Sequence, residues 1–435
     1  MRPLIPVSML ALLPATLMAC GGTVTSDLST QDAGGSDTSN PFIQPSLDGG
    51  SPDVDAAPVV IDAGPPVGYP APHPPMPQVI TGGGAVMAAP HIIPIVFPND
   101  AFQTDINTFV AGIGATPYWT ANTQEYGVGA ATGAAVVAVT DTAPTTIDDS
   151  AVGPWIVSKI TAGKLPAPTA NTLYAIYYPA STTVTLQGAT SCNQFGGYHD
   201  QGQDSNGNAF SYAVIPRCQG LGGLTGLDDV TGASSHEFIE AATDPLPQSM
   251  TPAYGQVDDD HLIWEFLLGG GETGDMCAQN PGAFYKPQGF NYTVQRSWSN
   301  QQAAASHDPC APALGTPYFN SAPVLDDVIN LNIGGQSITT KGVKIPVGQS
   351  KVVELDLYSD APTSGAWTVK ALDGAQLQQQ PTNLTFAFDK TSGQNGDKIK
   401  MTIKVVTTGM YNVESFLLVS KMYGQESLWA GLVSN

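Results

Sequence analysis

Short apolar runs and helix-like spacings alternate along the chain between about residues 79 and 245. The brief runs that predict strands, because they are rich in β-branched or aromatic residues, are His91–Phe97, Ala134–Val139, Leu173–Tyr178 and Phe210–Ile215. Apolar residues at helical intervals predict helices within Asp105–Ile113, Asp148–Ala162 and Thr225–Ala242. Strands that alternate with helices are typical of a mixed α/β layer with one central sheet, which we assign to residues 79–315.

The pattern changes after about Ala322, where period-two strands are separated by turns of Gly, Pro, Asn and Asp. The predicted strands are Val328–Ile333, Val343–Pro346, Lys351–Leu357, Ala366–Ala371, Leu384–Phe388, Lys398–Val406 and Val413–Ser420. About seven short strands at such intervals predict an all-β, immunoglobulin-like sandwich over residues 322–435. This second domain has no cysteine and no evident site, so we expect either a binding module or a purely structural one.

The first residues predict export and lipid attachment. Arg2 is followed by an apolar run over residues 4–18, which ends in the tetrapeptide Leu17-Met18-Ala19-Cys20. A positive start, an apolar stretch and small residues at a cleavage site indicate a signal peptide, here residues 1–19. The tetrapeptide resembles a lipobox, which implies acylation of Cys20 and a membrane contact through this lipid. Gly21 after it implies sorting to the outer membrane, on its periplasmic or its exposed side.

Residues 20–78 have the composition of a disordered linker. They are mostly Ser, Asp, Gly, Thr and Pro, with few large apolar side chains. Such a stretch cannot bury enough apolar surface to offset the loss of chain entropy, and its proline-rich end favours an extended conformation. We expect a spacer that holds the folded part away from the lipid surface.

The net charge of −22, with 15 Lys and Arg against 37 Asp and Glu, argues against nucleic acid as a partner. Binding to nucleic acid needs clustered cations, and electrostatic docking on anionic lipid needs them too. High acidity favours solubility and does not by itself indicate a substrate.

Four cysteines remain besides Cys20, and an even number in an oxidising compartment predicts two disulfides. Of the three possible pairings we favour Cys192–Cys218 and Cys277–Cys310, because each closes a local loop. The alternative is a four-thiolate zinc site, which the absence of any C-x-x-C pair disfavours.

The segment Ser234–Pro245, SSHEFIEAATDP, contains the most specific candidate chemistry. His236 and Glu240 are one helical turn apart, so they project from the same face of the predicted helix. This is the geometry of the H-E-x-x-H motif with a glutamate in place of the second histidine, and in that motif the intervening residue, here Glu237, is the general base. A carboxylate can bind zinc, but this exchange also raises the odds of Ca²⁺, Mn²⁺ or no metal.

A third ligand is expected from the loop GGGETGDMC, residues 269–277, in which Glu272 follows His236 by 36 residues. Glycines allow the backbone to approach a site closely. Asp275 is the competing ligand, or a partner that orients His236. Further candidates are His199 and the cluster Asp258-Asp259-Asp260-His261, of which we favour His199 because Cys192 ties its loop. Tyr198, His199 or Tyr254 could stabilise the oxyanion of a reaction intermediate.

The string SHEFIEAATDP, with GETGDMC and the later YTVQRSWSN, resembles a family of secreted bacterial proteins that share S-H-E-x-x-E-A-x-T-D-P and a G-E-x-G-D-x-C loop. The likeness covers roughly residues 85–312. More remotely it resembles the plant EXORDIUM (phosphate-induced) proteins, which lack the H-E-x-x-E pair. The arrangement of the motif is similar to that of zincin metallopeptidases, and this implies a zincin-like α/β domain.

Two hypotheses follow. The first is a lipid-anchored, metal-dependent hydrolase of the cell envelope, a peptidase that acts on peptide or cell-envelope substrates. His236, Glu240 and Glu272 would hold Zn²⁺, and Glu237 would deprotonate the attacking water. The second is a non-catalytic surface protein, in which the α/β domain is a pseudo-enzyme and the sandwich binds glycan or protein. The sequence contains no G-x-S-x-G motif of serine hydrolases, no phosphate-binding P-loop and no dinucleotide-binding fingerprint.

Overall fold

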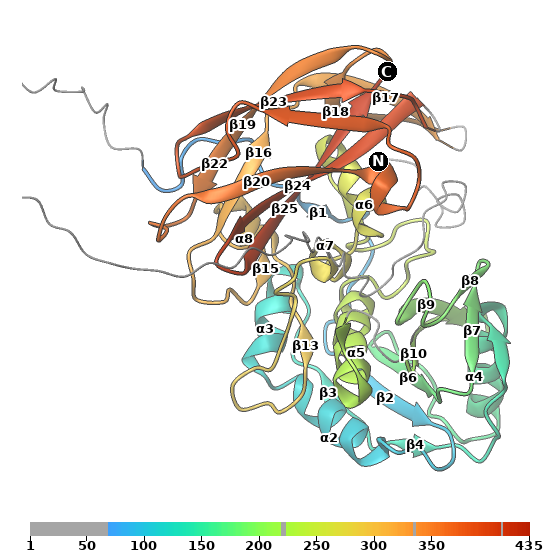
Figure 1. The fold of residues 1–435 in the computed structure, drawn as a ribbon. Helices are drawn as coiled ribbons and strands as arrows, with labels where there is room; N and C mark the ends of the chain where they lie inside the picture. Colours follow the sequence, from blue (N-terminus) through green and yellow to red (C-terminus); the bar gives the residue numbers. More distant parts are fainter. Residues whose placement is uncertain (1–67, 219–222, 334–335, 410–411) are drawn as a thin grey trace, which may run out of the picture.

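The computed structural model describes residues 68–435, apart from 219–222, 334–335 and 410–411. It shows a mixed α/β region followed by mostly antiparallel β-sheets, which Figure 1 places below and above one another. The expected signal peptide, Cys20 and most of the expected linker lie outside the described residues. Within the described part, none of the helices combines the length and the apolar character needed to cross a bilayer.

A six-stranded sheet forms the centre of the α/β region, with the order β3-β2-β6-β10-β9 and with β4 also paired to β2. Its strands are β2 (His91–Val96), β3 (Thr132–Gly133), β4 (Val137–Ala138), β6 (Thr172–Tyr178), β9 (Tyr198–Gln203) and β10 (Ala209–Pro216). All pairs are parallel except β9 with β10. The strands predicted at β2, β6 and β10 are confirmed, whereas the expected strand over Ala134–Val139 is reduced to the two residues of β4. The short strand β3 lies just before that range.

The buried strands alternate their side chains between two hydrophobic cores. In β6, Leu173, Ala175 and Tyr177 belong to one core, and Tyr174 and Ile176 to the other. The first core is covered by α2 (Gln103–Ile113), α3 (Pro117–Thr123) and α5 (Gly226–Thr243), and the second by α4 (Val152–Thr161). The three predicted helices are therefore confirmed as α2, α4 and α5, with α4 starting later than expected after the 3-10 turn η2 (Asp149–Ala151).

Short elements complete this region. They are β1 (Val79–Ile80), η1 (Gln124–Tyr126), β5 (Thr146–Asp148), β7 (Thr183–Leu186), β8 (Ala189–Thr190), β11 (Gln256–Val257), η4 (Asp259–His261), α6 (Ile263–Leu268), α7 (Asp275–Ala278), β12 (Phe284–Tyr285), β13 (Val294–Gln295), β14 (Ser297–Trp298), α8 (Asn300–Ala304) and β15 (Cys310–Ala311). The disulfides Cys192–Cys218 and Cys277–Cys310 are present as predicted. They indicate an extracytoplasmic protein, because such bonds persist in oxidising compartments.

Two further sheets follow. One has the order β16-β19-β23-β21 and the other β17-β18-β25-β24-β20-β22. Their strands are β16 (Phe319–Pro323), β17 (Asp327–Ile333), β18 (Gln336–Lys344), β19 (Ser350–Ser359), β20 (Trp367–Asp373), β21 (Leu384–Phe388), β22 (Ser392–Gly393), β23 (Lys398–Val405), β24 (Val413–Met422) and β25 (Gln425–Ser434), with helix α9 at Gly374–Leu377. Most of the predicted strands are found here, whereas β16, β22 and β25 were not anticipated. The expected strand Val343–Pro346 overlaps only the last two residues of β18.

A single hydrophobic core runs from these sheets into the α/β region. Trp264 of α6 lies with its ring centroid 5.8 Å from that of Trp429 in β25 and 5.8 Å from that of Trp298. Residues 68–78, assigned to the linker from composition, join the same core: Ala71 and Met76 are buried, and the ring of His73 stacks on Tyr358 at 3.5 Å. The last part of the expected linker is therefore packed, because its few apolar groups meet a surface that the sequence does not reveal.

Candidate metal centre

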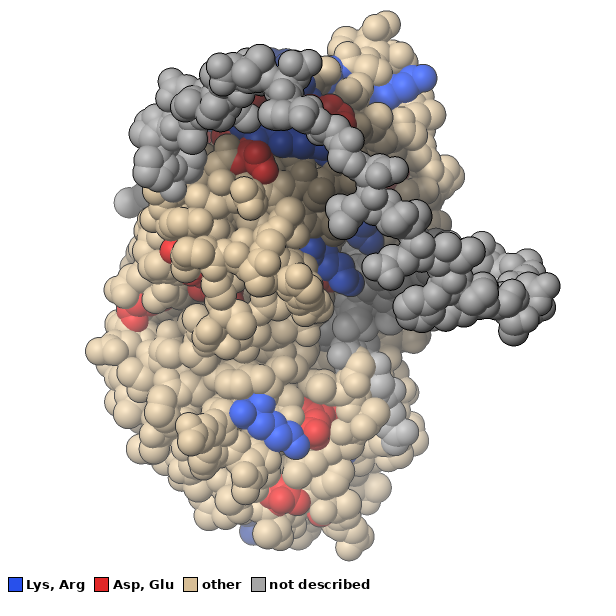
Figure 2. Space-filling model, turned by 60° about the vertical axis from the view of Figure 1, so that its left-hand side comes forward, with Lys and Arg blue, Asp and Glu red and all other residues tan. Residues whose placement is uncertain are grey.

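Helix α5 carries the H-E-x-x-E motif and is buried along almost its whole length. Every residue from Asp229 to Thr243 is buried, so the carboxylates of Glu237 and Glu240 lie inside the protein rather than in solvent. The helix ends before Asp244 and Pro245, as expected from the proline. By contrast, the acidic side chains visible in Figure 2 are scattered over a largely uncharged surface. Burial of two carboxylates one turn apart needs compensating positive charge.

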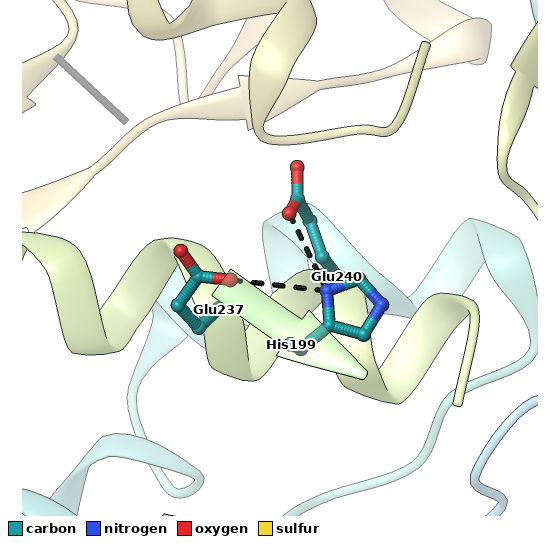
Figure 3. Close-up of side chains that lie close together, drawn as sticks. All are labelled: His199, Glu237 and Glu240. Carbon is teal, nitrogen blue, oxygen red and sulfur yellow. Dashed lines mark ion pairs between the residues drawn. The ribbon is translucent and has the colours of Figure 1, made fainter. Parts of the chain in front are cut away.

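His199 approaches this helix from the edge strand β9, opposite Ala213 in β10. Three carboxylate oxygens surround its Nδ1 atom, namely Glu237 Oε2 at 3.8 Å, Glu240 Oε2 at 3.7 Å and Glu272 Oε2 at 3.6 Å. Figure 3 shows the glutamates of α5 directed at the imidazole. We call these four residues the cleft cluster.

The backbone fixes the proton on the His199 ring. Its Nε2 lies 3.0 Å from the carbonyl oxygen of Asp244, which can only accept a hydrogen bond, so Nε2 donates. In the neutral imidazole, Nδ1 then carries a lone pair. That lone pair faces three carboxylates, which are themselves acceptors, so a cation or a proton is needed between them.

His236 is held in the same way on the other side of Glu240. Its Nδ1 lies 3.1 Å from Gln295 Oε1, and Gln295 Nε2 donates to the Gly274 carbonyl at 2.8 Å, which fixes the orientation of the amide. Nδ1 of His236 is therefore the donor, and its Nε2 faces Glu240 Oε2 at 3.0 Å and Asp275 Oδ1 at 3.7 Å. We call His236, Glu240 and Asp275 the inner cluster.

Glu240 belongs to both clusters and is held by the backbone. Its Oε1 accepts hydrogen bonds from the N–H groups of Gly274 at 3.1 Å and Asp275 at 3.0 Å. Its other oxygen, Oε2, is left facing both imidazoles. Burial alone would raise the pKa of Glu240, but the attraction and hydrogen bonding of His236 and His199 outweigh it and hold this pKa well below its usual range.

Glycine is required at position 274 for this close approach. A Cβ atom there would lie 2.7 Å from Glu240 Oε1 and 2.8 Å from His236 Nδ1. A Cβ atom at Gly197 would likewise lie 2.7 Å from Glu237 Oε1. The glycines of the loop GGGETGDMC and of the turn before β9 thus let two backbone segments close over the helix.

Glu237 is buried and has no hydrogen-bond partner at either carboxylate oxygen. Its only ion pair within 4.0 Å among the described residues is the distant one to His199. Burial raises the pKa of Glu237, although the two histidines oppose this. An unpartnered carboxylate that is 1% exposed and directed at an imidazole lone pair is the strongest sign of a missing positive group here.

The pKa values of Glu272 and Asp275 are raised, like that of Glu237. Burial, reinforced by the surrounding carboxylates, raises the pKa of Glu272 and of Asp275 well above the usual range. Burial opposes protonation of His199, but attraction by the cleft-cluster carboxylates prevails and raises its pKa well above 6.5. Without a cation the cluster therefore binds protons in its place.

A cleft of about 180 Å³ opens onto the cleft cluster. Its lining includes His199, Glu237, Glu240, Glu272 and Asp275, together with the glycines 269–271. His236 is not part of the lining, whereas Glu240 and Asp275 are, so the inner cluster adjoins the cleft with its histidine set back from it. A small molecule or an extended peptide backbone can reach the cleft cluster from solvent through this opening.

The structure brings together most of the site residues predicted from sequence, but it distributes them differently. Glu272 lies beside His199, not beside His236 as expected, and Asp275 takes the position next to His236. Tyr198 points to the opposite face of the sheet, where its ring centroid lies 5.7 Å from that of Phe195, because side chains alternate along β9.

The remaining candidates have structural partners. Tyr254 packs edge-on against Tyr126, with ring centroids 4.8 Å apart. In the cluster Asp258–His261, Nδ1 of His261 pairs with Asp258 at 2.8 Å, and Asp258 also accepts a hydrogen bond from the Gln78 N–H at 2.7 Å. That cluster fastens the start of the folded part to the turn η4.

Two supporting groups were not identified from the sequence. Gln295 lies in the string YTVQRSWSN, which attracted attention only by resemblance, and the carbonyl of Asp244 has no sequence signal at all.

No family model matches the chain, and no curated protein matches it. Among solved structures the chain is similar to domains 4 and 5 of the S-layer protein SbsC, at 14% identity with a TM-score of 0.16, over 29% of this chain and 80% of that one. It is also similar to the titin M3 domain, at 11% identity with a TM-score of 0.15, over 27% of this chain and 94% of that one. Likeness at this level does not bear on the site.

Proposed function

We propose that the protein is a metal-dependent hydrolase of the cell envelope that cleaves peptide bonds. The observation that carries this proposal is the unpartnered, buried carboxylate of Glu237 beside an imidazole lone pair at the base of an open cleft. The combination of a metal-ligand set with an adjacent free carboxylate is what metal-assisted hydrolysis needs.

The cleft cluster fits a divalent ion held by His199 Nδ1, Glu240 Oε2 and Glu272 Oε2. Two ligands that each lie about 2.1 Å from a tetrahedral ion are about 3.4 Å apart. The nitrogen-to-oxygen distances of 3.7 and 3.6 Å are close to that separation. The tight group of possible ligands around this imidazole contains Glu237 and Glu240 but not Glu272, so the Glu272 carboxylate has to move toward Glu240 when an ion binds. One nitrogen and two carboxylates suit Zn²⁺ or Mn²⁺.

Such an ion, when bound, would polarise the carbonyl of the scissile bond and lower the pKa of water. Glu237 then accepts a proton from the water that attacks the carbonyl carbon, and it returns this proton to the amine as the C–N bond breaks. Burial raises the pKa of Glu237, which suits a group that takes up a proton and returns it. His199 is oriented for its part by the Asp244 carbonyl, and Glu240 by the two amides of the loop.

Other features of the proposal rest on the sequence. The lipobox supports attachment through Cys20 to the outer membrane, where peptides of the envelope are within reach. A zincin-like arrangement is supported by α5 lying along the sheet beneath the antiparallel edge strand β9. The two C-terminal sheets, with their shared core, support an immunoglobulin-like sandwich that also braces the loop through Trp264 and Trp429.

The test is hydrolysis of a broad peptide library by the purified full-length chain, with elemental analysis of the same sample. Glu237→Gln should retain the ion and lose at least about 100-fold in rate, because it keeps the shape and removes the base. Glu354→Gln, a change to a surface carboxylate paired with Lys398, is the matched control and should leave the rate unchanged. A chain without metal and without hydrolysis would instead support a non-catalytic surface protein.

A further inference from the structure

The two imidazoles of the site are in separate groups of possible ligands. In one, atoms of His199, Glu237 and Glu240 lie within 4.8 Å of one another, and in the other the same holds for His236, Glu240 and Asp275. No group this tight among the described residues contains both histidines. Two ligands of one ion, each about 2.1 Å from it, cannot be more than about 4.2 Å apart. A single ion therefore does not use both imidazoles in this arrangement.

Building on the hydrolase function proposed above, we propose a second divalent cation in the inner cluster, bound by His236 Nε2, Glu240 Oε2 and Asp275 Oδ1. Glu240 then bridges two ions through its carboxylate. Its Oε2 lies 3.0 Å from one imidazole nitrogen and 3.7 Å from the other, so it is placed between the two positions. Two ligand atoms that are each about 2.1 Å from an ion and at right angles to each other are about 3.0 Å apart, which is the distance between His236 Nε2 and Glu240 Oε2.

Charge supports two ions rather than one. Four carboxylates face the two imidazoles, and all of them are largely or fully buried: Glu237, Glu240, Glu272 and Asp275. When ionised they carry four negative charges, and the histidines are neutral when they bind metal. One divalent ion leaves two of these negative charges to be neutralised by bound protons, whereas two divalent ions balance all four, and buried uncompensated charge is strongly unfavourable.

The inner cluster is also rigidly supported. Gln295 accepts a hydrogen bond from His236 Nδ1 and thereby fixes the ring. Its backbone N–H donates to Ser235 Oγ at 2.8 Å, and its side-chain amide donates to the Gly274 carbonyl. Asp275 begins α7, which the disulfide Cys277–Cys310 ties to β15. His236 does not line the cleft, whereas Glu240 and Asp275 do, and the ion of the inner cluster would serve to position Glu240.

The experiment is metal stoichiometry of the full-length chain. Protein stripped with a chelator and then dialysed against excess Zn²⁺ or Mn²⁺ should hold two ions per chain by elemental analysis. In the Mn²⁺ form, the bridge through Glu240 should couple the two spins and suppress the six-line electron paramagnetic resonance signal of isolated Mn²⁺. His236→Ala and Asp275→Asn should each lower the count to one, whereas His307→Ala, at a half-exposed histidine paired with Asp360, should leave it at two.

One ion per wild-type chain at saturation, with an uncoupled six-line signal, would overturn the second site. The spectrum is measured on the unaltered protein, so this outcome is decisive even where a variant fails to fold. It is also separate from failure of the hydrolase function: a chain with one ion that cleaves peptides keeps that function without the second site, and a chain with two ions that cleaves nothing loses the function and keeps both sites.

Discussion

Substitution of Gly274 by alanine tests whether the loop closes over the helix as tightly as the structure shows. The backbone at Gly274 has φ −73° and ψ −45°, a conformation that alanine adopts freely, so any cost is steric. The new methyl carbon would lie 2.7 Å from Glu240 Oε1, 2.8 Å from His236 Nδ1 and 2.9 Å from His236 Cε1. Ordinary contacts between such atoms are about 3.5 Å, so each atom must retreat by roughly 0.5–1 Å.

Overpacking of this kind in a well-packed interior costs about 1–3 kcal/mol. Because Glu240 and His236 are the groups that must move, we expect the loss to appear in metal binding as a decrease of about 5- to 150-fold in affinity. The metal-free variant should also melt earlier, by about 2–4 °C for each kcal/mol. Calorimetric titration of the stripped protein with Zn²⁺, together with thermal unfolding followed by circular dichroism, measures both quantities.

Gly365→Ala is the matched control. A Cβ at this glycine meets no atom within 4 Å, so its melting temperature and metal affinity should equal those of the wild type. If Gly274→Ala bound Zn²⁺ as tightly as the control and melted at the same temperature, then the loop would not lie against Glu240 and His236. The two-cluster geometry described above would be wrong in that case.

Three further results are expected. Burial, only partly offset by a hydrogen bond from the Cys218 backbone, raises the pKa of Asp229 from 3.8 to about 7. The Asp229 carboxyl therefore ionises first in the unfolded chain, and its contribution to stability should fall as pH rises from about 4 to 7. Asp229→Asn should remove this part of the pH dependence and, after a discount for solvent screening, stabilise the protein at pH 8 by about 2–4 kcal/mol, as measured by urea unfolding at each pH. Replacement of both Cys277 and Cys310 by alanine opens a loop with a sequence separation of 33 residues and should lower the free energy of unfolding by about 3–4 kcal/mol. Metal binding should also weaken, because α7 is no longer tied to β15. An unchanged midpoint of urea unfolding would refute this prediction. When the protein is dialysed at a series of pH values from 8 down to 5, elemental analysis should show that metal is lost at the acidic end. Protons compete with the metal for the imidazoles and for Glu272 and Asp275, whose pKa values are raised. An ion content that is independent of pH would contradict the ligand assignment.

Much of the local structure follows from the sequence. The apolar runs of β2, β6 and β10 are so continuous that only strands buried on both faces account for them, and Pro245 ends α5 where expected. The loop lengths between cysteines were enough to choose the disulfide pairing. The sequence also identified the H-E-x-x-E segment and the acidic glycine loop, because helical periodicity places His236 and Glu240 on one face whatever the rest of the chain does.

Only the tertiary structure decided which acid accompanies which histidine. Sequence spacing treats Glu272 and Asp275 as equivalent members of one loop, but the turn before α7 directs them to opposite sides of Glu240. His199 reaches the site because β9 pairs antiparallel with β10 at the sheet edge, a long-range contact with no local signal. The proton positions on both rings likewise depend on the Asp244 carbonyl and on Gln295, which are distant in sequence from the histidines they hold. Periodicity fixes the direction of a side chain within its own element, whereas the meeting of elements is set by packing between segments far apart along the chain.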